Sequence, residues 1–235
     1  MIKGVIFDLD GTLLDRDQSL VAFLEDQYNR IQELHRIDKK VFIQRFIELD
    51  QKGYVWKDKV YQKLLEELNI DLYWQDLLDD YVESFQNHCI GFPGLFEILD
   101  YLKGMNIKLG IISNGFERFQ MNNIRGLKII QYFDEILISE IEGIRKPNIG
   151  IFQRALVRLG IEAKEAIFVG DHPIHDVEAS INAGMKGIWV EGNYFDKPSK
   201  DCFIIKNLIE IRGILATISG IHPSARQESD VDSEK

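Results

Sequence analysis

The stretch Asp8-Leu9-Asp10-Gly11-Thr12 follows directly on Val5-Ile6-Phe7, a short apolar run that predicts a buried β-strand. Asp8 and Asp10 stand two residues apart where the strand gives way to a turn, so both carboxyl groups can approach one small volume. Gly11 allows a backbone path that other residues resist. Two carboxylates that close repel each other, which implies a cation, a shared proton or both. Taken alone, the same residues could also form an acidic turn with solvated side chains.

The composition is that of an ordinary globular chain with an excess of acid. The 235 residues are 45% hydrophobic and 11% aromatic, which is enough for one large domain or two small ones. A formal net charge of -10 disfavours nonspecific binding to nucleic acid or to an anionic membrane, because both are polyanions. We expect no nucleic-acid partner and no membrane partner, while a small phosphorylated molecule stays compatible with this charge.

The cysteines and the first residues indicate the compartment. Cys89 and Cys202 form no CxxC or CxH spacing, so they predict free, buried thiols in a reducing environment. The N-terminus lacks the apolar centre of a signal peptide, and no apolar run approaches the roughly 18 residues of a membrane span. The sequence therefore predicts a soluble cytoplasmic protein.

Residues 17–88 carry a helical pattern, because apolar side chains recur there at steps of three and four residues. The recurring positions are Leu20, Phe23, Leu24, Tyr28, Ile31 and Leu34; Phe42, Phe46 and Leu49; Tyr61, Leu64, Leu65 and Leu68; and Leu77, Leu78, Tyr81, Val82 and Phe85. Four amphipathic helices of this kind predict a small bundle whose aromatic side chains form its core.

After Pro93-Gly94 the pattern changes to alternating strands and helices. Apolar strands are expected at 107–112, 135–139, 166–170 and 187–190, and the crossovers between them are long enough to require parallel pairing. Together with the first strand, they predict a doubly wound, Rossmann-like α/β core with a parallel five-stranded sheet, into which the helical bundle is inserted as a cap after strand one.

The predicted domain organisation follows from these patterns. Residues 1–15 and 91–222 are assigned to the α/β core and residues 16–90 to the helical cap. A last helix is expected at about 206–219, and residues 223–235 predict a disordered tail because they hold almost no apolar side chains.

Three later strand ends also carry polar motifs. Ser113-Asn114-Gly115 follows the second strand, and Arg145-Lys146-Pro147-Asn148 follows the third, with Pro147 expected to open the next helix. Gly170-Asp171 ends the fourth strand, and Asp176 comes five residues later. Because ligands bind beyond the carboxyl ends of the strands in doubly wound folds, all of these groups are expected around one cleft.

The ordered set of four motifs resembles that of the haloacid dehalogenase (HAD) superfamily of aspartyl-phosphate-forming hydrolases, over about residues 1–195. The matching segments are Asp8-Leu9-Asp10-Gly11-Thr12, Ser113-Asn114-Gly115, Lys146-Pro147, and Gly170-Asp171 with Asp176. The helical insert is similar to that of the subgroup containing phosphoglycolate phosphatases, nucleoside-monophosphatases and the dehalogenases proper. One departure is Asn148, where many relatives have an aspartate.

The resemblance implies a Mg²⁺-dependent phosphatase, a phosphoric monoester hydrolase that acts on a small phosphorylated metabolite. Asp8 would be the nucleophile and would form an aspartyl-phosphate, with Asp10 as general acid and base. Mg²⁺ would lie between the Asp8 carboxylate, the Asp10 backbone carbonyl and the Asp171 carboxylate. Asp176 would support the site from behind these ligands or through a water.

The resemblance also assigns the groups that bind the phosphoryl oxygens. These are Thr12, Ser113, the Asn114 backbone N–H and Lys146. Substrate choice would lie in the cap, where Tyr54, Trp56 and Lys57 of the loop 51–59 resemble a loop that relatives use to touch substrate. Structural packing of Tyr54 and Trp56 explains these two residues equally well.

Four other functions share parts of this pattern. A phosphomutase has every core residue, and a 2-haloacid dehalogenase uses the same nucleophile but needs neither a metal nor an acid at Asp10. A phospho-accepting receiver domain is about half this length and has no cap. A non-catalytic binding protein on an inactive scaffold is disfavoured by the intact set of acids and Lys146. The physiological substrate and the choice between monomer and homodimer stay open.

Overall fold

The computed structural model describes residues 1–220, so the tail predicted at 223–235 lies outside the described residues. Within 1–220, no helix combines the length and the apolar composition that crossing a bilayer requires. Both cysteines are free, as predicted, but each is only partly buried.

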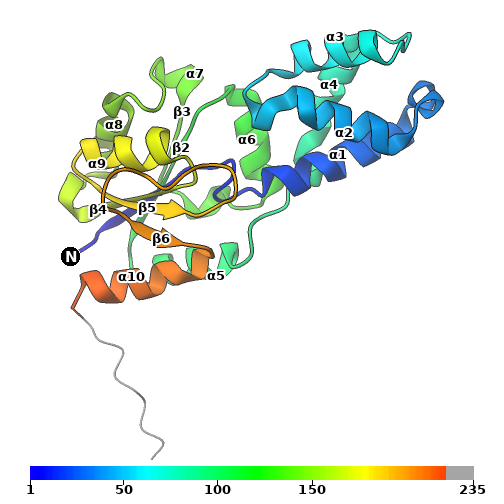
Figure 1. Cartoon of the computed structure of the whole chain (residues 1–235). Coiled ribbons are helices and arrows are strands. Elements are labelled where there is room, and N and C mark those ends of the chain that lie inside the picture. Colours follow the sequence, from blue (N-terminus) through cyan, green and yellow to red (C-terminus); the bar gives the residue numbers. More distant parts are fainter. Residues whose placement is uncertain (221–235) are drawn as a thin grey trace, which may run out of the picture.

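The centre of the molecule is a parallel sheet in the order β3-β2-β1-β4-β5-β6 (Figure 1). Its strands are β1 (Gly4–Phe7), β2 (Lys108–Ser113), β3 (Glu135–Ile138), β4 (Ala166–Gly170), β5 (Lys186–Val190) and β6 (Phe203–Ile205). The five predicted strands and their parallel pairing are confirmed. The strand count of five is wrong, because β6 adds a sixth strand at the edge beside β5. Its three residues are too few to show a period in the sequence.

The register of the sheet aligns the ends of its three central strands. Phe7, the last residue of β1, lies beside Ile111 of β2 and Val169 of β4. Ser113 therefore lies two residues beyond the partner of Phe7 on one side, and Asp171 lies two residues beyond it on the other. This places the polar motifs of three loops around the end of β1, as the sequence predicts.

Alternate residues of the strands face two separate apolar cores. Val5 and Phe7 pack in a large cluster, while Ile6 packs in a smaller one on the other face. The smaller cluster is covered by α8 (Ile149–Leu159) and α9 (Ala179–Asn182), and the larger by α5 (Leu95–Gly104), α6 (Glu117–Gly126) and α10 (Ile211–Ile218). Figure 1 shows α8 and α9 on one side of the sheet and α5 and α10 on the other.

The cap consists of the four helices predicted from residues 17–88. They are α1 (Arg16–Arg30), α2 (Lys39–Asp50), α3 (Lys57–Glu67) and α4 (Trp74–Ser84), and they project from one end of the sheet (Figure 1). As the period predicts, aromatic side chains such as Phe42, Phe46 and Tyr61 are fully buried between these helices.

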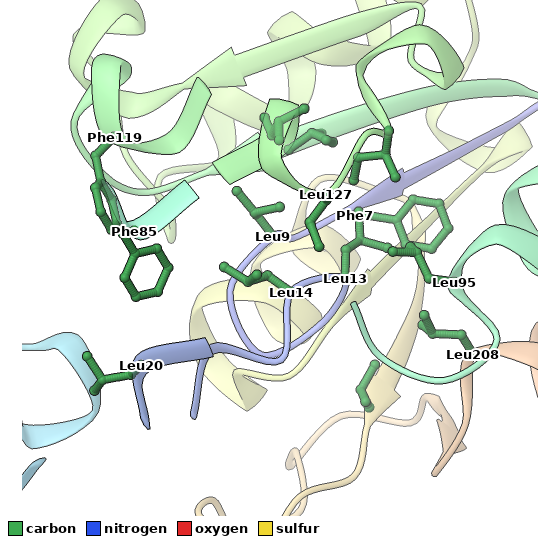
Figure 2. Packing of buried hydrophobic residues seen from close by; sticks show 14 of the residues in the cluster. Phe7, Leu9, Leu13, Leu14, Leu20, Phe85, Leu95, Phe119, Leu127 and Leu208 are labelled. Carbon is green, nitrogen blue, oxygen red and sulfur yellow. The ribbon is translucent and has the colours of Figure 1, made fainter. Parts of the chain in front are cut away.

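The cap and the sheet share one continuous apolar core. Tyr81 of α4 stacks on Phe119 of α6, with ring centroids 5.0 Å apart, and the Phe85 ring lies 5.2 Å from the Phe119 ring. Figure 2 shows this pair beside the leucines of the loop that follows β1. Leu9 and Leu13 of that loop are completely buried, and their packing anchors the loop that carries Asp8 and Asp10.

Two predicted helix boundaries are wrong. Pro147 does not open a helix, because Asn148 caps α8 by accepting a hydrogen bond from Gly150 N and the first helical residue is Ile149. The last helix is shorter than predicted and begins at Ile211, because a 3₁₀ turn (Leu208–Glu210), capped by the Asn207 side chain, precedes it.

Candidate active site

The loop after β1 lies against the loop after β4. Gly11 adopts a left-handed φ of +83°, and a Cβ atom there would lie 2.4 Å from Oδ2 of Asp171. Only glycine fits both the backbone angle and this approach. The first and fourth motifs therefore meet directly, with Asp8 and Asp171 on either side of the contact.

Lys146 brings the third motif to Asp8. Its ammonium group is buried and lies 2.5 Å from Asp8 Oδ1 and 2.6 Å from Asp176 Oδ1. The second Asp176 oxygen accepts a hydrogen bond of 3.0 Å from the backbone N–H of His172. Both oxygens of Asp176 thus have partners, and this residue holds Lys146 against Asp8.

Asn114 joins the second motif to the third through its side chain. The Lys146 backbone N–H donates to Asn114 Oδ1 at 2.9 Å, and Asn114 Nδ2 donates to the Lys146 carbonyl at 3.0 Å. This reciprocal pair fixes the backbone that carries the lysine. The role predicted for Asn114, a backbone N–H for phosphate, concerns a different atom, and the side-chain role is new.

Three carboxylates of the site converge. Asp8, Asp171 and Asp176 each offer one oxygen, and these oxygens lie within 4.8 Å of one another. The backbone of Asp171 is held from behind, because the Trp189 indole N–H donates to its carbonyl at 2.7 Å. Hard divalent cations prefer carboxylate oxygens as ligands. The three converging carboxylates therefore fit such an ion.

The protonation of the site reflects its burial. Desolvation raises the pKa of Asp8 to about 7, against the lowering effect of Lys146, and the Asp176 and Asp10 carboxylates raise it further. Burial, followed by the carboxylates of Asp8 and Asp176, holds the pKa of Asp171 well above its usual range. Burial lowers the pKa of Lys146, but Asp176 and Asp8 outweigh it and keep this pKa above its ordinary value.

Two buried hydroxyl groups belong to the first and second motifs. Ser113 is 1% exposed, and its Oγ has no hydrogen-bond partner among residues 1–220. Thr12 is fully buried, with Oγ1 3.5 Å from Asp8 Oδ2. A buried hydroxyl without a partner is costly, and an anionic oxygen bound beside it would satisfy it.

Asp10 is not one of the three converging carboxylates and has its own partner. Gln120 Nε2 of α6 donates to Asp10 Oδ2 at 2.7 Å, and Asn123 Nδ2 donates in turn to Gln120 Oε1 at 3.3 Å. Gln120 and Asn123 are both buried. This chain of amides fixes the orientation of the Asp10 carboxylate at the rim of the site.

The core and the cap both line the cavity at this site. A cavity of about 940 Å³ is lined by Asp8, Asp10 and Lys146 from the core and by Tyr54, Trp56 and Lys57 from the cap. The Trp56 ring packs 4.6 Å from the Phe116 ring, whereas Tyr54 is 60% exposed. The structure thus brings the three predicted cap residues to the cavity, Trp56 as part of an aromatic contact between cap and core.

Several residues of the site carry no signal in the sequence. Gln120 and Trp189 act through hydrogen bonds to residues far away along the chain, and neither belongs to one of the four motifs. Asn114 belongs to the second motif, but the motif does not indicate that its side chain bonds to the backbone of Lys146. The spacing of Gln120 from Ser113 places it on the first turns of a helix, which is the one feature that could have pointed to it.

The raised pKa of Asp8 predicts how stability depends on pH. An acid whose pKa is 3.8 in the unfolded chain and about 7 in the folded chain stabilises the fold below pH 3.8, and this contribution is lost as the pH rises to 7. The Asp8→Asn variant lacks this titration. In EDTA, we expect its melting temperature to rise relative to the wild type as the pH increases from 5 to 8. A difference that does not change with pH would show that Asp8 ionises normally in the folded protein.

Comparisons with known proteins agree with this geometry. The model of a family described as haloacid dehalogenase-like hydrolase matches residues 5–190. A glyceraldehyde 3-phosphate phosphatase of Pyrococcus abyssi is 30% identical over 194 residues, which cover 80% of this chain and 81% of that protein. A solved HAD phosphatase from Thermococcus onnurineus aligns with a TM-score of 0.65 and 27% identity, covering 91% of this chain and 98% of its own. A solved 2-haloacid dehalogenase from Pseudomonas syringae aligns with a TM-score of 0.63 and 29% identity, covering 93% and 100%.

Proposed function

This chain belongs to the haloacid dehalogenase-like hydrolases, and from that membership we propose that it is a phosphatase of small phosphomonoesters. The observation that carries the proposal is the buried Lys146 ammonium group, 2.5 Å from Asp8, in the same cavity as Ser113, whose hydroxyl has no hydrogen-bond partner among residues 1–220. A carboxylate nucleophile surrounded by such groups suits an electrophile whose oxygens are negatively charged.

In the proposed reaction, one oxygen of Asp8 forms a bond to phosphorus while the bond between phosphorus and the leaving oxygen breaks. Asp10 donates a proton to that leaving oxygen. In the second step Asp10 takes a proton from water as the water attacks phosphorus, and the bond to Asp8 breaks to release phosphate. Lys146, Ser113, Thr12 and the Asn114 backbone N–H would hold the other phosphoryl oxygens.

A divalent cation completes this proposal, and the oxygen donors favour Mg²⁺. The Asp8 and Asp171 carboxylates and the Asp10 backbone carbonyl would hold it, while Asp176 is taken up by Lys146. When bound, the ion would offset the charge of the carboxylates and of the incoming phosphate. At neutral pH it would also favour the ionised, nucleophilic form of Asp8, whose pKa burial otherwise raises to about 7.

A 2-haloacid dehalogenase fits this site less well, although one solved relative carries that name. Displacement of a halide needs no proton donor, whereas Asp10 is held at the rim of the cavity by a buried amide chain. The converging carboxylates likewise suit a metal-dependent phosphoryl transfer. A phosphomutase is compatible with every core residue and is separated from a phosphatase by its products.

The experiment that tests the function is an assay with p-nitrophenyl phosphate and Mg²⁺, in which p-nitrophenol and inorganic phosphate are both measured. Because p-nitrophenolate leaves without a proton, the Asp10→Asn variant is expected to form the aspartyl-phosphate and then stall. Mass spectrometry after an acid quench should locate the phosphate on the peptide that contains Asp8. Absence of phosphate release by the wild type would contradict the proposal.

The hydrogen bond from Gln120 predicts a leaving-group-dependent defect. In the Gln120→Met variant the Asp10 carboxylate loses its donor and its fixed orientation, so we expect kcat/KM for an alkyl phosphate, which reports formation of the aspartyl-phosphate, to fall about 10- to 100-fold. The effect on kcat/KM for p-nitrophenyl phosphate should be several-fold smaller, since that leaving group needs no acid in this step. Gln131→Met, at an exposed glutamine, is the control. Equal losses for both esters would mean that Gln120 only supports the fold.

The remaining parts of the proposal concern the setting of the enzyme. We place it in the cytoplasm, which its two free cysteines support. Its partner is a small phosphorylated metabolite rather than a nucleic acid, and it acts as a monomer or a homodimer.

A further inference from the structure

Three charged side chains of the cap form a group at the cavity, here called the cap ion cluster: the buried Asp50 and Lys57 and the partly buried Arg16. Arg16 Nη2 lies 2.7 Å from Asp50 Oδ2, and Lys57 Nζ lies 2.6 Å from Asp50 Oδ1. Asp50 and Lys57 are 1% and 2% exposed. The backbone N–H of Gly53 also donates to Asp50 Oδ2, at 2.8 Å. Both oxygens of the carboxylate are therefore occupied.

The charges of the cap ion cluster do not balance, because two cations share one carboxylate. The next acid, Asp17, lies 4.0 Å from Arg16 Nη1, beyond hydrogen-bond distance, and it is paired with the exposed Lys52. Within residues 1–220, Asp50 is the only side chain that forms a hydrogen bond with the Arg16 guanidinium. The Arg16 side chain is 14% exposed, so its N–H donors that do not contact Asp50 are open to an anion in the cavity, which would offset the excess positive charge.

The excess charge faces the reaction centre. Arg16 and Lys57 line the same cavity as Asp10, whereas Asp50 lies behind them and does not line it. Burial lowers the pKa of Lys57, the Asp50 carboxylate raises it, and Asp10 also raises it to a smaller extent, which places Lys57 within electrostatic reach of Asp10. In the proposed reaction Asp10 protonates the leaving oxygen, so the rest of the leaving group extends from Asp10 toward the cap.

We propose that Arg16 and Lys57 bind a second anionic group on the leaving-group side of the substrate. This inference rests on the proposed phosphatase function and names its substrate class: phosphomonoesters whose alcohol part carries a carboxylate or a second phosphate. The planar guanidinium of Arg16 offers paired donors for either anion, and Lys57 adds a point charge. Asp50 holds both cations in position, which reduces the ordering cost of binding.

The substrate class proposed for this chain differs from the substrate named for one relative. Glyceraldehyde 3-phosphate, after which the Pyrococcus abyssi relative is named, has an uncharged aldehyde and hydroxyl on its leaving group. A site in which two cations share one carboxylate favours an anionic group over a neutral one, because a neutral group leaves the excess positive charge uncompensated. We expect a preference of at least tenfold in kcat/KM for the charged substrate.

The test compares matched esters that differ in one group. 3-Phosphoglycerate and glycerol 3-phosphate differ by a carboxylate, and fructose 1,6-bisphosphate and fructose 6-phosphate differ by a phosphate. In each pair we measure kcat/KM at saturating Mg²⁺. A preference of tenfold or more in either pair supports the inference, and the pair that shows it identifies the anion.

Variants then assign the preference to the cap ion cluster. Lys57→Met and Arg16→Gln are each expected to reduce the ratio of kcat/KM within the preferred pair at least tenfold, mainly through KM of the charged ester. Arg16→Lys should retain more of the ratio than Arg16→Gln, because it keeps the charge. Lys63→Met removes an exposed lysine from α3, the helix that also contains Lys57, and should leave the ratio unchanged. Melting temperatures show which variants are folded.

The outcomes test the anion-binding site and the phosphatase function separately. If the wild type hydrolyses p-nitrophenyl phosphate but treats both members of each pair alike, the inference is overturned and the phosphatase function stands. The inference also fails if the variants lower kcat/KM equally for charged and neutral esters. If no ester is hydrolysed, p-nitrophenyl phosphate included, the proposed function fails and the inference falls with it.

Discussion

Replacing Asp8 with asparagine is expected to abolish phosphate release, lowering kcat by at least about 10⁴-fold. The oxygen of Asp8 forms the bond to phosphorus in the proposed reaction, and an amide oxygen is a poor nucleophile that gives no stable intermediate. The measurement is the initial rate with p-nitrophenyl phosphate and Mg²⁺, followed long enough to detect a residual turnover.

The Asp8→Asn variant is expected to fold, because asparagine has the same shape and Lys146 keeps its ion pair with Asp176 at 2.6 Å. Removing one of three converging carboxylates also relieves their mutual repulsion. Asp79→Asn, at an exposed position of α4, makes the same charge change away from the site and should keep full activity. An Asp8→Asn enzyme with a tenth of the wild-type rate would place the nucleophile elsewhere.

Removal of divalent metal is the second large effect, with an expected loss of at least about 10³-fold in kcat that Mg²⁺ reverses. Without an ion, three carboxylates face the single ammonium group of Lys146. A phosphate dianion entering this site would add to their repulsion, which is about 4 kcal/mol for two unit charges 4 Å apart at an effective dielectric of 20. Near pH 7 a large part of Asp8 would also be protonated and unable to attack, since its pKa is about 7.

The experiment adds EDTA, measures the rate, and then restores Mg²⁺ in excess over the chelator. A parallel melting curve gives a readout that does not depend on turnover, since an ion that binds the folded carboxylates should raise the melting temperature. The rise should be smaller in the Asp171→Asn variant, which lacks a proposed ligand. Full activity in excess EDTA would rule out the metal-dependent mechanism.

Much of the site could be predicted because its motifs are local. Each motif follows an apolar strand along the chain, and the parallel sheet brings the ends of these strands to one edge. Asp8, Lys146 and Asp171 therefore lie together as the order of the motifs indicates. Pairings such as that of Phe7 with Ile111 and Val169 place the loops that carry them.

Other features depend on contacts that have no local pattern. Gln120 acts on a residue 110 positions earlier, and Asn114 clamps a residue 32 positions later. The cap ion cluster likewise joins Arg16 at the start of α1 to Asp50 at the end of α2. The spacing of apolar residues and the positions of turn residues do not predict which polar side chains form contacts. Such contacts depend on how the helices pack.

By itself, then, the sequence determined the parallel α/β core, the helical insert and the four motifs, because strand and helix periods and the residues at strand ends are local properties. The tertiary structure decided that Asp8 and Asp10 face different partners, Lys146 and Gln120 respectively. It also decided that two cations of the cap share the single acid Asp50 above the cavity. The physical reason is that burial and long-range packing select the partner of a charged group, and both arise only when the chain is folded.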